Sequence, residues 1–263
     1  MDPVQTHTAM SDEPTFSIVL PTKDRPELAS RAVKSALAQT RGDFEVVVAD
    51  NGENPLRPDS AWMDDPRVRI HRTGGLIMCD NWQAAFQQAR GKYVCLIEDK
   101  MALTPESLQM AYDAIEHDHL DVLIYSIGTN NSATRIEDKP IRIYPIDREE
   151  LFDAVAQCCL DHYSKIGPRT LNCVFRRSYA EEVSRRSGRL FRPMSPDYSC
   201  GAQLLAGPGK LAYTPGHLAM FLPGPSLGNA YASGGEGAQL AEREFGGSIQ
   251  NLVADLPSQS LLF

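Results

Sequence analysis

The chain has 263 residues, of which 42% are hydrophobic and 23% are charged, and its formal net charge is −8 at pH 7. This composition is typical of a soluble globular protein, and the length suffices for one large α/β domain with a real core. The negative charge excludes duplex nucleic acid as an expected partner, because such binding needs clustered lysine and arginine against phosphates.

The six cysteines form no Cys-x-x-Cys pair, and several lie in apolar runs. We therefore expect free buried thiols in a reducing cytosol rather than a disulfide framework or a zinc site. The first residues lack the apolar stretch of a signal peptide, and no run approaches the ~18 apolar residues that span a bilayer. A cytoplasmic protein without a transmembrane segment is expected, with peripheral attachment at the inner membrane face left open.

Apolar runs alternate with amphipathic stretches over the first half. After a polar lead-in at 1–14, which we expect to be disordered, strands are predicted at 16–20, 44–49, 67–71 (an edge strand), 93–97 and within 121–127. One helix is predicted after a capping box formed by Asp24 and Glu27, a second ends at Gly91, and a third starts near Thr104. This alternation predicts a mostly parallel sheet with helices on both faces.

The second half is less regular. Strands are predicted at 141–144 and 171–175, and helices after a capping box at Asp147 and from Ser195 to Gly207. Gly, Pro, Ser and Asn dominate from 223 to 237, which favours a mobile loop that could close over a site. Without a repeat or a clear linker, a single continuous domain is expected.

Polar side chains follow three of the predicted strands. They are Thr22 and Asp24, then Asp50 and Asn51, then Glu98, Asp99 and Lys100. One carboxylate after a strand is more often a turn residue or a helix cap. Three such sets in one α/β pattern favour a site, because ligands of these sheets bind beyond the carboxyl ends of the strands.

Six segments, in this order, resemble the family 2 glycosyltransferases, which have the GT-A fold, a Rossmann-like α/β architecture. They are 16–25 with its Pro-Thr turn, 36–40, 44–52 with its terminal Asp, 78–82 (the Met-x-x-Asn-Trp of one bacterial branch), 89–94 before the D-x-D-type position, and the Ser-Pro-Asp at 195–198. The ordered set is more specific than any one segment.

The resemblance implies an inverting transfer of a sugar from a nucleoside diphosphate sugar, UDP being the first expectation, to the hydroxyl of a glycan or small-molecule acceptor. It divides a domain at 15–222 into a nucleotide-sugar half at 15–127 and an acceptor half at 128–222, followed by a loop-rich C-terminal segment at 223–263. Pro21 and Thr22 would lie against the base, Asp50 would accept from a uracil-type N–H, and Asp99 would hold the ribose. Asp197 would be the general base, in a helical first turn where the dipole favours its ionised form.

Lys100 departs from the family pattern. Many relatives carry a carboxylate at this position that holds a divalent cation, whereas an ammonium has no lone pair for a metal. In the preferred interpretation Lys100 contacts the diphosphate itself, helped by Arg25 or Arg72, and no metal is required. Two alternatives remain open: a non-catalytic nucleotide-sugar or glycan-binding relative, or recruitment of Mg²⁺ or Mn²⁺ through Glu98 or Asp99.

The expected substrate-binding residues are Pro21, Thr22, Arg25, Asp50, Asn81, Glu98, Asp99 and Lys100, and the expected catalytic residue is Asp197. Asn51, where Asp is usual, is a second departure, and Trp82 is expected in the core rather than as a sugar platform. A nucleotidyltransferase is disfavoured because 21–25 contains no glycine, and a carboxylate-pair hydrolase is weaker still.

Overall fold

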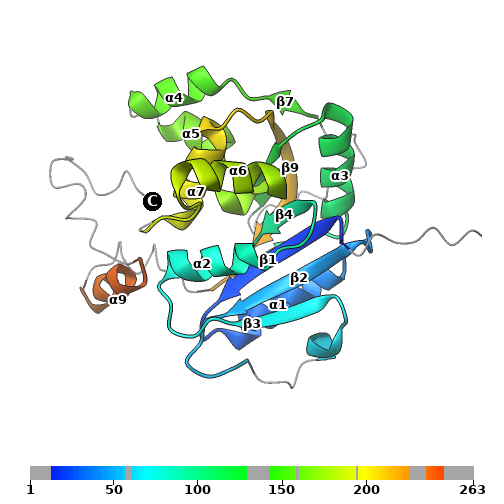
Figure 1. Cartoon of the computed structure of the whole chain (residues 1–263), viewed down its shortest axis with the longest axis vertical. Coiled ribbons are helices and arrows are strands. Elements are labelled where there is room, and N and C mark those ends of the chain that lie inside the picture. Colours follow the sequence, from blue (N-terminus) through cyan, green and yellow to red (C-terminus); the bar gives the residue numbers. More distant parts are fainter. Residues whose placement is uncertain are drawn as a thin grey trace, which may run out of the picture.

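The computed structural model describes residues 13–56, 61–128, 142–157, 160–193, 195–224 and 235–245. Within them a sheet of nine strands has the order β3-β2-β1-β4-β8-β6-β9-β5, with β7 beside β9 (Figure 1). The strands are β1 (Phe16–Thr22), β2 (Phe44–Asp50), β3 (Val68–Arg72), β4 (Tyr93–Leu96), β5 (Met101–Leu103), β6 (Val122–Gly128), β7 (Tyr144–Pro145), β8 (Cys173–Arg176) and β9 (Leu211–Phe221).

The first half of the sheet is parallel, as its alternation of strands and helices predicts. β3, β2, β1 and β4 all run the same way, and β3 lies at the edge. β8 then runs antiparallel to both of its neighbours, β6 and β9 are parallel, and β5 and β7 are antiparallel to β9. All seven residues of β1 and of β2 are buried, which is why both strands read as nearly continuous apolar runs.

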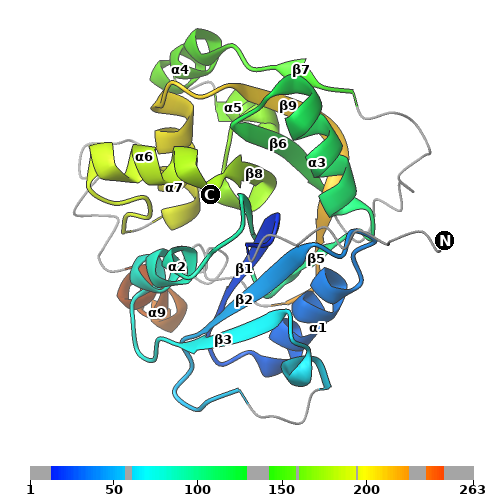
Figure 2. The same ribbon diagram turned by 45° about the vertical axis from the view of Figure 1, so that its right-hand side comes forward.

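Helices cover both faces of the sheet (Figure 2). α1 (Pro26–Leu37) and α3 (Ser107–Asp118) lie on one face, and α2 (Met78–Gln87), α6 (Arg177–Ser187) and α7 (Pro196–Ala206) on the other. The remaining described helices are α4 (Arg148–Ala156), α5 (Leu160–Ile166), α9 (Gly235–Phe245) and the 3₁₀ turns η1 (Ala61–Asp64) and η2 (Thr170–Asn172). The buried side of α1 carries Ala29, Ala32, Val33 and Ala36, the spacing of one helical face.

Two of the predicted helix boundaries were wrong. Asp24 does not cap α1: it adopts a left-handed φ of 53°, Arg25 occupies the N-cap, and the Asp24 carboxylate accepts from the backbone N–H of Glu53 at 2.9 Å. Gly91 does not end α2, which stops at Gln87. A β-carbon at Gly91 would lie 2.5 Å from the backbone of Phe16, so this glycine lets the loop before β4 cross β1. The cap at Asp147 is confirmed, since its Oδ1 accepts from the Glu150 N–H at 3.2 Å.

Sequence patterns missed several elements of the second half. β5, α5, α6 and β9 were not predicted, and α9 lies where a loop-rich segment was expected. Pro215 and Gly216 interrupt the apolar pattern of β9, where the pairing with β6 also shifts register, so the strand has no clean alternation. Residues 225–234 of the expected mobile loop, Ile141 and most of the lead-in at 1–14 lie outside the described residues. Of the strand predicted at 141–144, Arg142 and Ile143 are not in a strand, and only Tyr144 belongs to one, β7.

The core expectations hold for the described residues. Cys79, Cys95, Cys173 and Cys200 are free and buried, while Cys158 and Cys159 lie outside the described residues. Trp82 packs edge-on against Phe191, with ring centroids 5.9 Å apart, and belongs to the core as expected.

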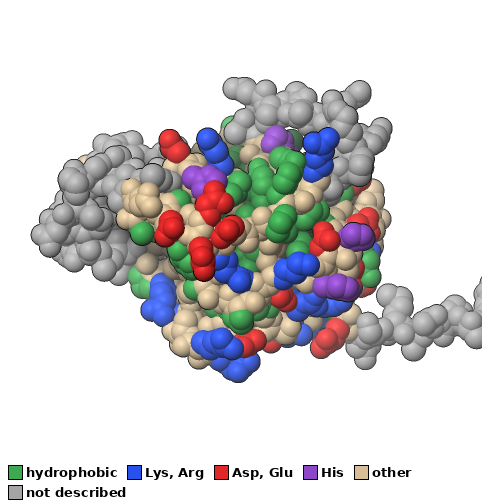
Figure 3. All heavy atoms as spheres, turned by 90° about the horizontal axis from the view of Figure 1, so that it is seen from above, with side chains coloured by type: hydrophobic (Ala, Val, Ile, Leu, Met, Phe, Trp, Pro, Cys, Tyr) green, Lys and Arg blue, Asp and Glu red, His purple; other side chains and the backbone are tan. Residues whose placement is uncertain are grey.

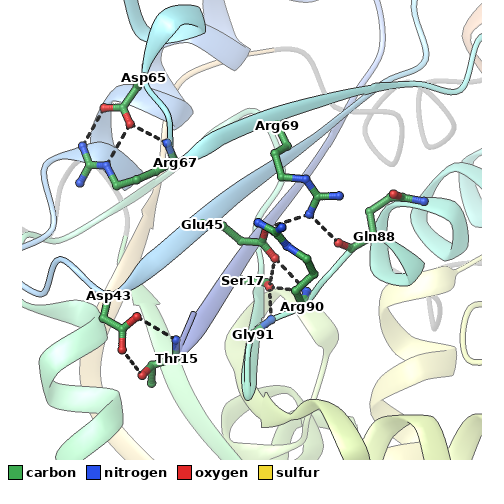
Figure 4. A network of polar contacts seen from close by, with 10 residues as sticks. All are labelled: Thr15, Ser17, Asp43, Glu45, Asp65, Arg67, Arg69, Gln88, Arg90 and Gly91. Carbon is green, nitrogen blue, oxygen red and sulfur yellow. Dashed lines mark hydrogen bonds and ion pairs between the residues drawn. The ribbon is translucent and has the colours of Figure 1, made fainter. Parts of the chain in front are cut away.

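The buried carboxylate of Glu45, near the start of β2 and at the opposite end of that strand from Asp50, binds three neighbouring segments (Figure 4). Glu45 accepts from Ser17 Oγ at 2.7 Å, from Arg69 Nη1 at 2.8 Å and from the backbone N–H of Arg90 at 2.8 Å. Burial opposes its ionisation, but the hydrogen bonds from Ser17, Arg69 and Arg90 prevail and hold the Glu45 pKa below its ordinary value. This cluster fastens β1, β2, β3 and the loop after α2 together.

Hydrophobic and acidic side chains share the end of the molecule that carries α4 (Figure 3). Phe152 and Val155 of α4 are 43% and 44% exposed, whereas Leu151 on the inner side is buried. Glu149 and Glu150 in the first turn of the same helix are exposed. The acidic first turn makes this surface a poor match for an anionic lipid membrane.

Candidate active site

The ends of β1, β2 and β4 bring the predicted residues to one edge of the sheet. Thr22 pairs with Asp50 in the parallel register of β1 and β2. After β4 the chain still runs beside β1, because the Ile97 N–H donates to Val19 O at 2.9 Å. Two residues later it reaches Asp99. Thr22 Oγ1 donates to Asp99 Oδ2 at 2.8 Å, so these two side chains meet, with Asp50 on the neighbouring strand, although the three residues are far apart in sequence.

Asp99 is the most enclosed carboxylate of this edge, with 0% of the residue exposed. Its Oδ2 accepts from Thr22 and from Arg25 Nε at 2.9 Å, whereas Oδ1 is buried and has no hydrogen-bond partner within the described residues. Burial raises the pKa of Asp99, and the Arg25 charge and the Thr22 hydrogen bond oppose that rise. A buried carboxylate oxygen without a donor is costly, so the site is suited to a ligand that supplies one, such as a hydroxyl.

Asp50 is buried with 1% exposure and is already held by the protein. It accepts from Arg72 Nη1 at 2.7 Å, from the Leu56 N–H at 2.9 Å and from the Gly52 N–H at 3.2 Å. These contacts fold the loop after β2 around the carboxylate. Arg72 is thus engaged by Asp50, and Arg25 is engaged by Asp99 in a separate ion pair, whereas either arginine had been expected to help bind a diphosphate.

The amide side chain of Asn51, at a position where Asp is usual, binds the loop after β3. Its side-chain N–H donates to Leu76 O at 2.7 Å while its Oδ1 accepts from the Leu76 N–H at 2.9 Å. A carboxylate could not do both, because it has no proton to donate when ionised. Asn81 is buried and accepts from Thr73 Oγ1 at 2.7 Å in the same loop. Asn51 and Asn81 therefore secure the loop between β3 and α2.

Lys100 lies between the edge and the end of β9. Its Nζ is 3.6 Å from Glu98 Oε1 and 5.5 Å from the centroid of the Phe221 ring, and its carbonyl accepts from the Leu222 N–H at 2.6 Å. Burial raises the pKa of Glu98 to about 7, with Lys100 opposing the rise and the charges of Asp99 and Asp197 adding to it. Lys100 thus supplies positive charge among three carboxyl groups.

Asp197 reaches the same region from the second half of the chain. It lies in the first turn of α7, where its backbone carbonyl accepts from Thr170 Oγ1 at 3.1 Å. Burial raises the pKa of Asp197, opposed by the Tyr198 N–H and by the charges of Arg169 and Lys100. The charge of Asp197 adds to the rise in the pKa of Glu98, and the charge of Lys100 opposes the rise in that of Asp197, so the predicted base and the predicted donor residues share one electrostatic environment. Sequence reasoning missed Arg169, because no motif marks it.

The acidic side chains of the described residues are the candidate ligands for a metal ion at this edge. Among the described residues, no cluster of three or more His, Cys, Asp and Glu side chains has the geometry to hold a metal ion. Glu98 and Asp99 are adjacent, but the Lys100 ammonium lies next to Glu98 and cannot be a ligand.

Comparison with known proteins decides the family. Residues 17–184 match the model of glycosyl transferase family 2. The chain belongs to this family. The glycosyltransferase expected from the sequence is thereby confirmed at the level of the family.

Among curated proteins, the putative colanic acid biosynthesis glycosyl transferase WcaA of Escherichia coli is 31% identical over 105 residues, covering 38% of this chain and 38% of that protein. The O-antigen biosynthesis protein RfbC of Myxococcus xanthus is 33% identical over 102 residues, covering 36% of this chain and 8% of that protein. The matches therefore span less than two fifths of the length of either relative.

Solved structures confirm the fold. TarS of S. aureus superposes with a TM-score of 0.63 at 14% identity, covering 94% of this chain and 46% of TarS. Residues 1–349 of TarS in complex with UDP-GlcNAc give a TM-score of 0.60 at 14% identity, covering 94% of this chain and 78% of that one. The expected GT-A-type α/β domain is thus confirmed. None of the described helices combines the length and apolar character needed to cross a bilayer.

Proposed function

We propose that this member of the family is an inverting glycosyltransferase that uses a nucleoside diphosphate sugar, UDP-linked first, and an acceptor hydroxyl. The observation that carries the proposal is the buried Asp99, held on one oxygen by Thr22 and Arg25 and open on the other, at the edge that Asp50 shares. This arrangement offers an acceptor to a ribose hydroxyl. The UDP-GlcNAc and UDP complexes of TarS support a uridine nucleotide as the first donor to test.

The reaction needs a base for the acceptor hydroxyl and a positive charge for the leaving group. As the acceptor oxygen attacks the anomeric carbon, the bond from that carbon to the diphosphate oxygen breaks and the hydroxyl proton passes to Asp197. Burial raises the pKa of Asp197 and so makes it a stronger proton acceptor than an exposed aspartate, while the charges of Arg169 and Lys100 favour its ionised form. One displacement from the opposite face inverts the anomeric configuration.

Lys100 is proposed to stabilise the charge that develops on the diphosphate. Its ammonium occupies the position where relatives hold a metal-binding carboxylate, and its loose 3.6 Å contact with Glu98 leaves it able to move to a phosphate. Arg25 is committed to Asp99 at 2.9 Å, which favours Lys100 for this role.

Donor binding and turnover are tested together with a panel of UDP-, GDP- and dTDP-sugars in thermal-shift and product assays. We expect a UDP-sugar to raise the melting temperature of both wild type and Asp197→Asn, because Asp197 does not bind the nucleotide. Transfer should fall by about 10²- to 10⁴-fold in Asp197→Asn, the usual contribution of a general base. Binding by the wild type without product from any acceptor tried would favour the non-catalytic alternative.

Metal independence is a second prediction. Turnover in excess EDTA should equal turnover in Mn²⁺, and Lys100→Met should lower it by about 10²-fold, since the leaving charge loses its partner. Lys34→Met, at an exposed position on α1, serves as the matched control and should leave turnover unchanged. Complete loss of wild-type activity in EDTA that Mn²⁺ restores would contradict the role given to Lys100 and support metal binding through Asp99.

A further inference from the structure

The turn before β8 is held rigidly by its own side chains. Tyr163 Oη donates to Pro168 O at 2.9 Å, the Arg169 N–H donates to Asn172 Oδ1 at 2.6 Å, and Asn172 Nδ2 donates to Gly167 O at 3.2 Å. Each bond fixes a backbone group of 167–172. The Cα of Arg169 therefore has a defined position.

Helix α7 packs directly on this turn. A β-carbon at Gly201 would lie 1.9 Å from Pro168 O and 3.0 Å from the Cα of Arg169, so the two backbones are in contact. Gly201 follows Asp197 by four residues, and residues at this spacing share one helical face. Thr170 Oγ1 adds a hydrogen bond to the Asp197 carbonyl at 3.1 Å. The face of α7 that carries Asp197 thus adjoins Arg169.

Within the part of the chain that the structure describes, the Arg169 guanidinium forms no ion pair at 4.0 Å or less. Its central carbon lies 5.8 Å from the centroid of the Tyr198 ring, and its Nε is buried without a hydrogen-bond partner in the described residues. A desolvated cation needs compensation from a nearby negative charge. Asp197 is the carboxylate at hand, and Arg169 is the side-chain charge that most strongly opposes the effect of burial on the pKa of Asp197.

Other groups around Asp197 come from three elements. Glu98 and Lys100 follow β4, Tyr163 lies on α5, and Tyr198 and Cys200 lie on α7. Lys100 is the second cation, but in the proposed reaction it turns to the diphosphate. Arg169 lies on a separate turn, whose backbone is held by the hydrogen bonds within 163–172.

We propose that Arg169 is a positioning residue for Asp197: its guanidinium favours the ionised form of the Asp197 carboxylate while Lys100 serves the leaving group. The role of this pair in catalysis rests on the proposed function, but the effect of the Arg169 charge on the ionisation of Asp197 does not.

The coupling is measured by ¹³C NMR on the full chain labelled at aspartate Cγ, with Asp197→Asn to assign the Asp197 signal. Titrations compare wild type with Arg169→Lys, Arg169→Gln and Arg169→Met, the last of which keeps an apolar contact with the Tyr198 ring. Arg148→Gln is the matched control. Arg148 of α4 also has a buried nitrogen without a hydrogen-bond partner among the described residues, and its Nε donates to Leu205 O of α7 at 2.9 Å. Its replacement therefore disturbs the helix that carries Asp197 but removes none of the charges that act on the Asp197 pKa.

We expect the Asp197 midpoint to shift upward in Arg169→Gln and Arg169→Met and to stay near wild type in Arg169→Lys and Arg148→Gln. In turnover assays, the acidic limb of the kcat profile should move upward with the same variants while KM for the donor is unchanged. An unshifted midpoint in whichever neutral variant folds, or an equal shift in Arg148→Gln, overturns the proposal. A shifted midpoint in a chain without turnover would instead refute the proposed function and leave the coupling intact.

Discussion

At the scale of single residues, the donor edge is built from polar groups that hold one another. Asp99 depends on Thr22 and Arg25, and Asp50 depends on Arg72 and on the loop after β2. Asp50 is thereby fully held, whereas Asp99 Oδ1 has no donor within the described residues, which is energetically costly for a buried carboxylate. We interpret this unsatisfied oxygen at the ends of β1, β2 and β4 as a group that a bound ligand would satisfy.

Thr22→Val tests this dependence. Valine keeps the shape but removes the donor to Asp99, so we expect a loss of about 1.5–3 kcal/mol in the free energy of unfolding and weaker binding of a UDP-sugar. Urea denaturation and calorimetry measure the two effects. Thr40→Val is the control, because the Thr40 hydroxyl makes only an exposed 3.3 Å contact with Pro105 O and its loss should be nearly neutral. Equal losses in both variants would show that Thr22 has no special role.

At the scale of elements, the site exists because three parallel strands end side by side. That alignment requires β4 to pair directly with β1. The loop between α2 and β4 crosses the start of β1 at Gly91. The Gly91 N–H donates to Ser17 Oγ at 2.8 Å at this crossing. Close backbone contact there sets the position of β4 and hence of Asp99.

Gly91→Ala should therefore destabilise the domain. The added carbon would meet the backbone of Phe16 and Ser17 at 2.5 Å, and we expect a loss of about 3 kcal/mol in unfolding free energy as the strands shift. Gly42→Ala provides the comparison, because a β-carbon at Gly42 has no neighbour within 4 Å. Chemical denaturation that finds the two variants equally stable would contradict this account of the crossing.

At the scale of the whole molecule, two groups of carboxylates give opposite pH dependence. Glu45 has a lowered pKa, so its stabilisation is complete above the ordinary value of 4.5 and is lost as the pH falls through its folded-state pKa. Glu98, Asp99 and Asp197 have raised pKa values, so the folded chain binds their protons more tightly. For Glu98, the unfolding free energy should rise as the pH falls from about 7 towards 4.5.

We expect the unfolding free energy to be greatest at about pH 5 and to decrease on either side. Urea denaturation between pH 3.5 and 8 tests this expectation. Glu98→Gln should flatten the decrease above the maximum, and Glu45→Gln should flatten the decrease below it. A wild-type stability that falls steadily from pH 8 to pH 5 would contradict the prediction.

The helix α9 is held by contacts between parts of the chain that are far apart in sequence. It lies beside α2, and Glu244 Oε1 is 2.6 Å from Lys23 Nζ, one residue after the end of β1 (Figures 1 and 2). A loop-rich segment was expected here, because Gly, Pro, Ser and Asn dominate from 223 to 237, directly before and into this helix. A partly exposed ion pair contributes about 0–1 kcal/mol, so α9 is weakly held by this contact.

The sequence by itself determined the alternation of β1, α1, β2, β3, α2 and β4, the cap at Asp147, the start of α7 and the polar residues at the strand ends. These features depend on neighbouring residues, and local patterns of burial and capping reveal them. Only the tertiary structure decided that β9 pairs with β6 through a register shift, that Gly91 fits where the loop crosses β1, and that the turn carrying Arg169 packs against the face of α7 that carries Asp197. Those contacts join residues far apart in the chain, and their energies come from close packing and desolvation, which no local pattern records.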